Sequence, residues 1–207
     1  SQFSGLHTQF AVLGSGEGIH PFNTTLDYDN FLGRMDGFVE WVDQSINNMR
    51  SGAAKGIVQP RVVIERTIPQ LAALAVEDPE RSVFWQPLQN FPKGVPARDR
   101  ERLVAAYRDK LASQVLPAYR RLHDYLKSEY LEQSRGIVGW SELPNGAEWY
   151  AYLARYHTTT SLTPEEIHEL GLAEVARIRA EMERIKEQVG HKGDLRSFFD
   201  ALRADPN

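Results

Sequence analysis

His168 and Glu169 come closest to a catalytic motif in this sequence. The residue four positions after the histidine is Leu172. A zinc-peptidase helix carries His-Glu-x-x-His, in which two imidazoles one turn apart bind the metal and the carboxylate between them activates water. Leu172 occupies the position of the second histidine. The other histidines also have no histidine four residues later: His7, His20, His123, His157 and His191. The sequence therefore predicts no metal site within this chain.

Glu165 and His168 have the Glu-x-x-His spacing that di-iron sites use in helical bundles. Such a site needs a second unit of this kind and two further inward carboxylates. The other match, Glu17 and His20, lies in a glycine-rich segment that does not predict a helix. We interpret His168 as a half-buried structural histidine that hydrogen-bonds a neighbouring glutamate.

His157, Thr158, Thr159 and Thr160 form the candidate substrate-cleft segment. Three consecutive β-branched hydroxyl residues disfavour helix and place several hydrogen-bonding groups in a loop between two predicted helices. One interpretation is a segment that contacts a substrate from a cleft wall. The other is an ordinary, well hydrogen-bonded turn between helices.

Other catalytic chemistries find no support in the residue types. The chain has no cysteine, which excludes disulfides, thiolate nucleophiles and cysteine-ligated metals. No serine lies in a Gly-x-Ser-x-Gly elbow. The run Gly14-Ser15-Gly16-Glu17-Gly18 continues as Ile19-His20-Pro21, not as Gly-Lys-Ser/Thr before a helix, and we interpret it as a surface turn. We assign no catalytic residue and no cofactor to this chain.

Charge and hydropathy restrict the partners. The 24 Lys and Arg residues are interleaved with 28 Asp and Glu residues, for a formal net charge of −4. No basic footprint for nucleic acid is present. No apolar run reaches the roughly 18 residues of a transmembrane segment. The first residues lack the basic and apolar regions of a signal peptide, and a signal peptide that has already been removed stays an alternative. Composition therefore does not decide the compartment.

Apolar residues recur at three- and four-residue steps, which predicts an all-α fold of about six helices, several of them long. The predicted helices cover about 27–51, 59–75, 97–133, 145–156, 163–189 and 194–202. Pro69 predicts a kink in the second, and Pro117 predicts a bend near residues 115–116 in the third. Residues 1–24 predict an extended, loop-rich entry, and residues 25–207 a helical domain.

Local signals refine this organisation at three places. Residues 78–96 hold four prolines but also aromatic side chains, which predicts a loop pinned onto the helices. The helix over 145–156 is aromatic on most faces and is predicted to be buried or to line a cleft. Thr163-Pro164-Glu165-Glu166 predicts a helix start with a capping box.

Three stretches resemble one bacterial family, the domain of unknown function 885, many of whose members carry lipoprotein names. They are Gly56-Ile57-Val58-Gln59-Pro60-Arg61-Val62-Val63, then Val115-Leu116-Pro117-Ala118-Tyr119-Arg120-Arg121-Leu122, then Trp149 to Leu153 with His157 to His168. The resemblance extends in the family's order from about residue 20 onward, and the last stretch is the most specific.

The resemblance implies a non-catalytic helical N-terminal portion of a longer protein, truncated at its C-terminal end. Family members carry in their later part a His-Glu-x-x-x-His-like element that resembles gluzincin zinc peptidases, and none of those ligands matches a position here. Zinc is therefore expected in the full-length parent and not in this chain. The implied partners are the rest of the parent chain and a peptide or small-molecule substrate. The implied location is the cell envelope or periplasm, with the cytoplasm left open.

Two functional hypotheses follow from the resemblance. In the first, this chain forms one wall of the substrate cleft of a zinc-dependent peptidase-like envelope protein. In the second, the parent is a ligand- or partner-binding scaffold lipoprotein without hydrolytic activity. On either hypothesis, surface that further polypeptide would cover predicts exposed apolar patches and self-association of this chain.

Overall fold

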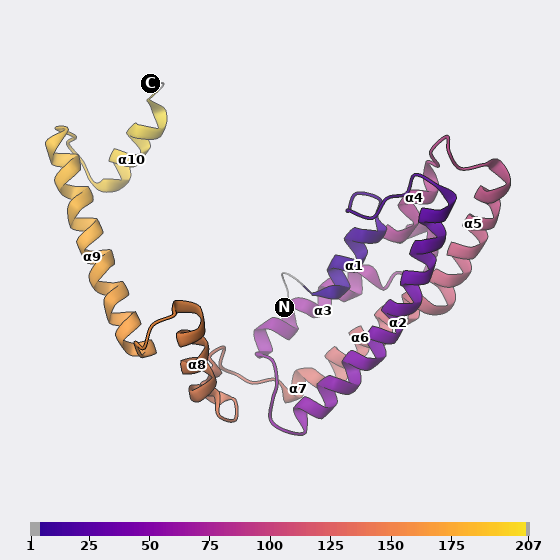
Figure 1. Ribbon diagram of the computed structural model, residues 1–207, viewed down its shortest axis with the longest axis horizontal. Helices are drawn as coiled ribbons and strands as arrows, with labels where there is room; N and C mark the ends of the chain where they lie inside the picture. The colour runs from indigo at the N-terminus through magenta and orange to yellow at the C-terminus, as the bar shows by residue number, and fades with distance from the viewer. Residues whose placement is uncertain (1–4, 206–207) are drawn as a thin grey trace. The chain divides into compact units, whose positions relative to one another are not determined.

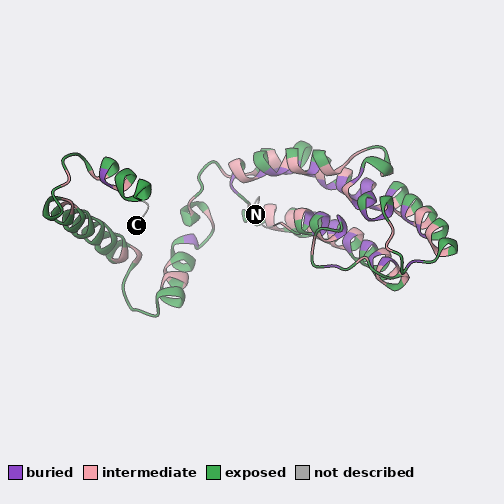
Figure 2. Ribbon diagram, turned by 90° about the horizontal axis from the view of Figure 1, so that it is seen from above, coloured by how far each residue is buried: buried purple, intermediate pink, exposed green. Residues whose placement is uncertain are grey.

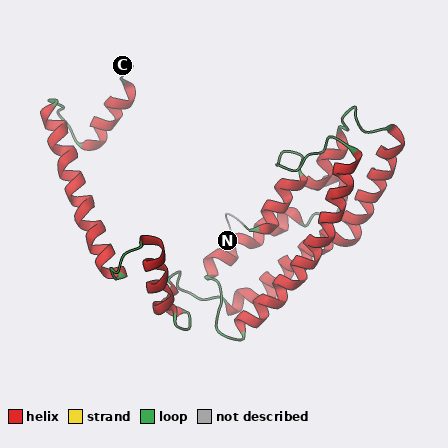
Figure 3. Ribbon diagram, in the orientation of Figure 1, coloured by secondary structure: helices red, strands yellow, loops and turns green. Residues whose placement is uncertain are grey.

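The computed structural model describes residues 5–205, in which helices joined by loops form the fold and no strand occurs (Figure 3), so the all-α prediction is confirmed. The contacts divide the chain into unit 1, Ser1–Pro144, and unit 2, Asn145–Asn207. This division falls far from residue 24, where the sequence suggested one. Figure 1 labels the helices.

Unit 1 is a helical bundle in which α2, Thr25–Ala53, is the longest unbroken α-helix. Thr24 caps it, and the Asp27 carboxylate accepts the Thr24 backbone N–H at 2.8 Å, which completes a capping box. The buried side chains of α2 repeat at three- and four-residue steps and form one stripe: Tyr28, Phe31, Met35, Phe38, Val42 and Ile46. This stripe packs in a core with α3, Arg61–Leu74, and with the third long helical segment.

That third segment runs as one helical path from Ala97 to Gln133 and includes two π-helical turns. Its parts are α5 (Ala97–Lys110), η3 (Leu111–Val115), α6 (Leu116–Tyr125), η4 (Leu126–Tyr130) and α7 (Leu131–Gln133). Pro117 has no N–H to donate to the preceding turn, and the π turn η3 ends two residues before it. A π turn thus ends where the bend near residues 115–116 was expected, and the bend itself stays a prediction.

The second π turn, η4, has no proline. Ser128 Oγ donates to Asp124 O at 2.6 Å, so a side chain competes for a carbonyl at this turn of the helix. A π turn inserts one extra residue and rotates the following side chains around the helix axis.

Residues 78–96 are pinned to the bundle, as predicted, and they contain short helical turns: Pro79–Arg81, Val83–Trp85 and α4, Gln86–Gln89. Phe84 is fully buried and Leu88 nearly so. Phe91 packs against Tyr28 with tilted rings and 5.2 Å between the ring centroids. The Tyr28 hydroxyl donates to Pro87 O at 2.9 Å. The segment thus adds aromatic area to the core.

The expectation of an extended, loop-rich entry over residues 1–24 is wrong at residues 6–14, while its first four residues lie outside the described part of the chain. Helix α1, Leu6–Gly14, buries Phe10 on the α2 stripe, with 4.4 Å between the ring centroids of Phe10 and Phe38. Tyr119 Oη donates to His7 O at 2.8 Å and holds α1 to α6. Apolar packing and this hydrogen bond stabilise helix α1, although the glycines that follow it suggested a loop.

Unit 2 consists of α8, Gly146–Thr158, α9, Pro164–Gln188, and α10, Leu195–Ala204. The predicted capping box is confirmed, since Glu166 N donates to Thr163 Oγ1 and Thr163 N to Glu166 Oε2. The predicted burial of α8 is wrong: Trp149, Tyr150, Tyr152 and Tyr156 are 46–65% exposed. Figure 2 shows unit 2 mostly in the colour of exposed residues.

Candidate functional site

The predicted substrate-cleft segment lies at the end of α8 in unit 2. His157, Thr158, Thr159 and Thr160 are all exposed, and Thr159 ends the helix with a φ of +57°. Thr158 Oγ1 donates to Ala154 O at 2.7 Å and lies 3.0 Å from Thr160 Oγ1. These bonds satisfy the helix end and account for the run of hydroxyls. A role of the four residues in substrate binding stays a prediction.

His168 lies exposed on the first turns of α9, and not half-buried as expected. The carboxylate of Glu166, a neighbour on the same turn, accepts the Thr163 backbone N–H instead. Within residues 5–205, no group of three or more His, Asp or Glu side chains is placed to hold a metal ion. The donor set required by a zinc centre is thus not found in this part of the chain.

The glycine-rich run after α1 is explained by packing. A Cβ on Gly14 would overlap the rings of Phe31 and Phe84, so only glycine allows α1 to approach them. Gly16 has a φ of +84°, a conformation that side chains with a Cβ rarely adopt. Both glycines therefore have structural reasons that involve no phosphate.

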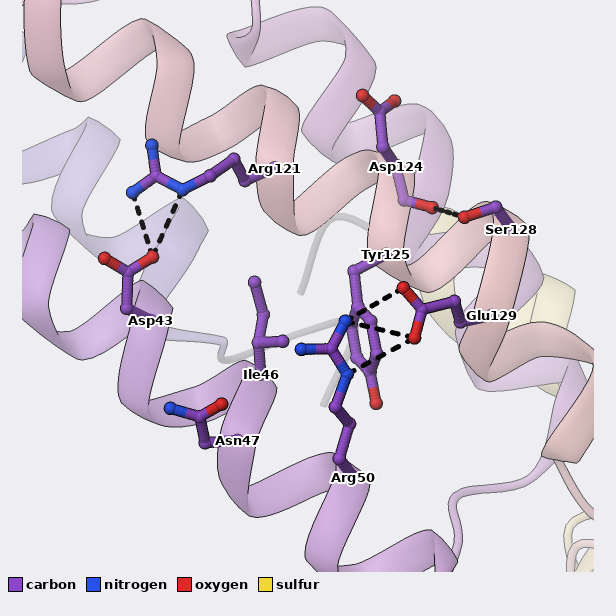
Figure 4. A pocket seen from close by; sticks show the side chains of 9 residues that line it. All are labelled: Asp43, Ile46, Asn47, Arg50, Arg121, Asp124, Tyr125, Ser128 and Glu129. Carbon is purple, nitrogen blue, oxygen red and sulfur yellow. Dashed lines mark hydrogen bonds and ion pairs between the residues drawn. The ribbon is translucent and has the colours of Figure 1, made fainter.

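A charged hollow of about 480 Å³ lies between α2 and the α6–η4 segment of unit 1 (Figure 4). Its lining residues are Asp43, Ile46, Asn47, Arg50, Arg121, Asp124, Tyr125, Ser128 and Glu129. Two ion pairs cross it: Arg121 Nη2 to Asp43 Oδ1 at 2.9 Å, and Arg50 Nη2 to Glu129 Oε1 at 2.9 Å. All four groups are about half exposed, so solvent screens both pairs and each contributes little to stability.

Tyr125 forms the floor of the charged hollow. The Arg50 guanidinium lies 4.9 Å from the centre of its ring, a cation–π contact. Burial raises the pKa of Tyr125, while Arg50 opposes that rise. The Tyr125 hydroxyl is buried without a hydrogen-bond partner among the described residues. Because the charges of this hollow already pair across it, we interpret it as a clamp between α2 and the long helical segment.

An apolar groove of about 560 Å³ lies elsewhere in unit 1. It is lined by parts of α1, α2, α3, α6 and η4 and by the loop after α2: Gly5, Leu6, His7, Trp41, Ser45, Asn48, Met49, Gly52, Ile57, Gln59, Val63, Ile64, Thr67, Leu71, Leu122, Leu126 and Tyr130. This lining contains no Asp, Glu, Lys or Arg. A concave, mostly apolar surface of this size with a few polar groups is typical of a small-molecule site.

His7 is the titratable histidine of the groove. It is 5% exposed, and its Nε2 lies 3.2 Å from Gln70 Oε1, to which it donates. Burial lowers the pKa of His7, since the charged imidazolium loses its hydration. The ring is therefore neutral near pH 7, and the side chains that line the groove carry no formal charge.

The π turn η4 supplies side chains to both hollows. Leu126 and Tyr130 line the apolar groove, whereas Ser128 and Glu129 line the charged hollow. Tyr130 Oη also accepts the Gln59 backbone N–H at 3.1 Å, which ties the loop after α2 to the groove wall. One short segment thus contributes to two surfaces of different chemistry.

Sequence reasoning did not find this groove. Its residues come from five separate segments, and His7 lies in the stretch that the glycines marked as a loop. One signal was available, because Leu6, Phe10 and Leu13 have the i, i+4, i+7 spacing of a helix face.

The fold and its surfaces define an all-α protein with an uncharged groove in unit 1. The chain belongs to the bacterial family of unknown function DUF885, whose family model matches residues 1–207. No curated protein sequence matches the chain.

One solved structure shows the same fold at a TM-score of 0.77 and 22% sequence identity, a protein of Colwellia psychrerythraea described as a putative lipoprotein. The match covers 90% of this chain and 32% of that protein, so this chain spans about a third of the length of that protein. Within residues 5–205, no helix is long and apolar enough to cross a membrane.

Proposed function

We propose that this chain is a helical, non-catalytic portion of a longer bacterial envelope lipoprotein, in which unit 2 packs its apolar face on further polypeptide. The observation that carries this proposal is the uncovered stripe of α9. The likeness to the Colwellia psychrerythraea protein, of which this chain spans 32%, supports both the greater length and the lipoprotein assignment.

The α9 stripe has the pattern of a buried helix face. Its side chains recur at three- and four-residue steps and are 38–65% exposed: Leu172, Val175, Ile178, Met182, Ile185 and Val189. The other side of the helix is polar, with Arg177 Nη2 at 2.9 Å from Glu174 Oε2 and Arg177 Nη1 at 3.1 Å from Glu181 Oε2. A continuous apolar stripe of this length on a soluble helix is typical of a contact surface.

Any zinc-dependent hydrolysis is proposed to belong to other parts of the longer protein. The support is the resemblance to gluzincin-like relatives together with the failed motif at His168 and Leu172. This chain would then supply one wall of the cleft, where His157 to Thr160 are the candidate contacts. Stoichiometric zinc in the longer protein and none tightly bound to this chain is the expected result of metal analysis.

Oxidation of methionine tests the packing proposal. Met182 is 38% exposed on the α9 stripe, whereas Met35 is fully buried in unit 1. Dilute peroxide should oxidise Met182 quickly in this chain and slowly in the longer protein, with Met35 slow in both as the internal control. Equal oxidation rates of Met182 in the two proteins would show that no further polypeptide covers α9.

The second candidate function is a ligand-binding scaffold lipoprotein without hydrolytic activity. The apolar groove favours it, since binding requires no metal and no catalytic group. The absence of stoichiometric zinc and of peptidase activity in the longer protein would favour this function over the peptidase hypothesis.

A further inference from the structure

We propose that the apolar groove of unit 1 is a binding site for an uncharged, predominantly apolar small molecule. All the residues that line the groove belong to unit 1, so the proposal does not depend on what covers unit 2. It also names a ligand class that neither the family nor the solved relative assigns.

The two hollows of unit 1 differ in the charge of the side chains that line them. The charged hollow holds five side chains of Asp, Glu and Arg type, while the lining of the groove holds none. His7 adds no charge, because burial keeps its imidazole neutral. An ionic ligand would lose its hydration in the groove and find no opposite charge to replace it. Charge complementarity thus selects a neutral occupant.

The shape and composition of the groove select a small apolar ligand. A volume of about 560 Å³ lies within the range of ligand sites, roughly 300–1,000 Å³. Trp41, Met49, Val63 and Leu126 present aromatic, thioether and aliphatic surface to it. Methionine adapts to irregular ligand shapes, because its side chain is unbranched and polarisable.

Three polar groups give the groove a means to orient such a molecule. Thr67 Oγ1 donates to Val63 O at 2.8 Å and retains lone pairs that accept a hydrogen bond. Tyr130 Oη accepts the Gln59 N–H, and its own proton remains as a donor. His7 is held in place by its bond to Gln70. A ligand with an apolar body and a hydroxyl, carbonyl or amide at one end can contact the apolar lining and also form hydrogen bonds with these polar groups.

A pair of fluorescent probes of similar shape tests the selection by charge. N-phenyl-1-naphthylamine is uncharged, and 8-anilino-1-naphthalenesulfonate carries a sulfonate on nearly the same ring system. The full chain should bind the uncharged probe at one saturable site, and it should bind the anionic probe at least about tenfold more weakly at that site, because the sulfonate must be desolvated. Equal affinities would overturn the proposal.

Substitutions locate the bound probe. Val63→Glu places a carboxylate in the groove and should weaken binding of the uncharged probe at least about tenfold. Val175→Glu makes the same chemical change on the exposed α9 stripe and should leave that affinity unchanged. If Val63→Glu fails to fold by circular dichroism, Ser45→Phe, at a partly exposed lining position, fills the groove without adding charge and should also abolish binding.

Two results would overturn the site. Binding that survives the folded groove variants but is lost with Val175→Glu would assign the probe to α9. Binding to this chain that disappears in the longer family protein would assign the groove to a polypeptide segment and not to a small molecule. Retained, groove-dependent binding in both proteins is the expected outcome.

Discussion

Units 1 and 2 are built from the same kind of amphipathic helix but differ in what those helices bury. In unit 1 the stripe of α2 lies in a core with fully buried members such as Phe31, Met35 and Val42. In unit 2 the stripe of α9 is exposed, and Phe198 of α10 is the large apolar side chain that the described part of the unit buries. The periodic pattern is therefore equal in the two units, while the packing is not.

An amphipathic sequence predicts which face of a helix is apolar, but not which segment covers that face. The spacing of apolar residues indicates the apolar face equally well for α2 and α9. The partner itself is supplied by other segments, such as α1 and residues 78–96 in unit 1. In unit 1 these segments cover the α2 stripe, which becomes part of the core. The α9 stripe stays exposed and available to bind another polypeptide.

The largest expected effect is that of truncating one stripe residue in each unit. Phe31→Ala removes a fully buried ring and should lower the free energy of unfolding of unit 1 by about 3–5 kcal/mol. Ile185→Ala, at a position 43% exposed on α9, should change stability by less than about 1 kcal/mol. Hydrogen exchange read by mass spectrometry reports on each unit separately. A large destabilisation by Ile185→Ala would show that the α9 stripe is buried in solution, for example by self-association.

The next effect concerns two glycines of unit 1 that differ in their surroundings. Gly14→Ala drives a methyl group into Phe31 and Phe84 and should destabilise the unit by about 1–3 kcal/mol. Gly33→Ala in α2 meets nothing within 4 Å and should stabilise it by about 0.5–1 kcal/mol, because alanine has the higher helix propensity. Urea unfolding measures both. Equal signs for the two variants would refute the packing explanation of Gly14.

Much of the helical organisation could be predicted from the sequence because its signals are local. The Thr163 capping box spans four residues, and the long stripes of α2, the Ala97–Gln133 segment and α9 repeat at steps of three and four residues. The prediction failed at α1, where Leu6, Phe10 and Leu13 indicated a helix but the glycines after it carried more weight. It also failed for α8, since aromatic side chains on most faces need a partner that the sequence pattern does not identify.

The groove could not be predicted, because it is assembled from side chains far apart in sequence. Tyr119 bonds the carbonyl of His7 across 112 positions, and Tyr130 bonds Gln59 across 71. The wall of the groove includes the π turn Leu126–Tyr130, and no proline marks that turn in the sequence. The substrate-cleft prediction at His157 to Thr160 rested on residue types alone and stays a prediction.

The next effect, about 1 kcal/mol of local helix stability, concerns the residues that cap α2 and α9. Thr24 and Thr163 each complete a capping box, one on α2 and one on α9. Thr24→Ala and Thr163→Ala should each remove about 1 kcal/mol of local helix stability. Because packing holds α2 and not α9, exchange should rise in the first turn of α9 but stay slow in α2. Fraying of equal extent in both helices would contradict the view that unit 1 is held by its core.

The smallest effect is a pH dependence of unit 1 that arises from His7. Burial holds the pKa of this imidazole below 6.5 in the folded chain, so the unfolded chain takes up the proton first as the solution becomes acidic. Stability is therefore complete above about pH 6.5 and falls as the pH drops from there toward the lowered pKa. His7→Gln should flatten this dependence, and His168→Gln, at an exposed position of unit 2, serves as the matched control. Urea midpoints for unit 1 between pH 7 and pH 5 measure it. An unchanged slope in His7→Gln would mean that His7 is not the buried neutral group on which the charge argument for the groove depends.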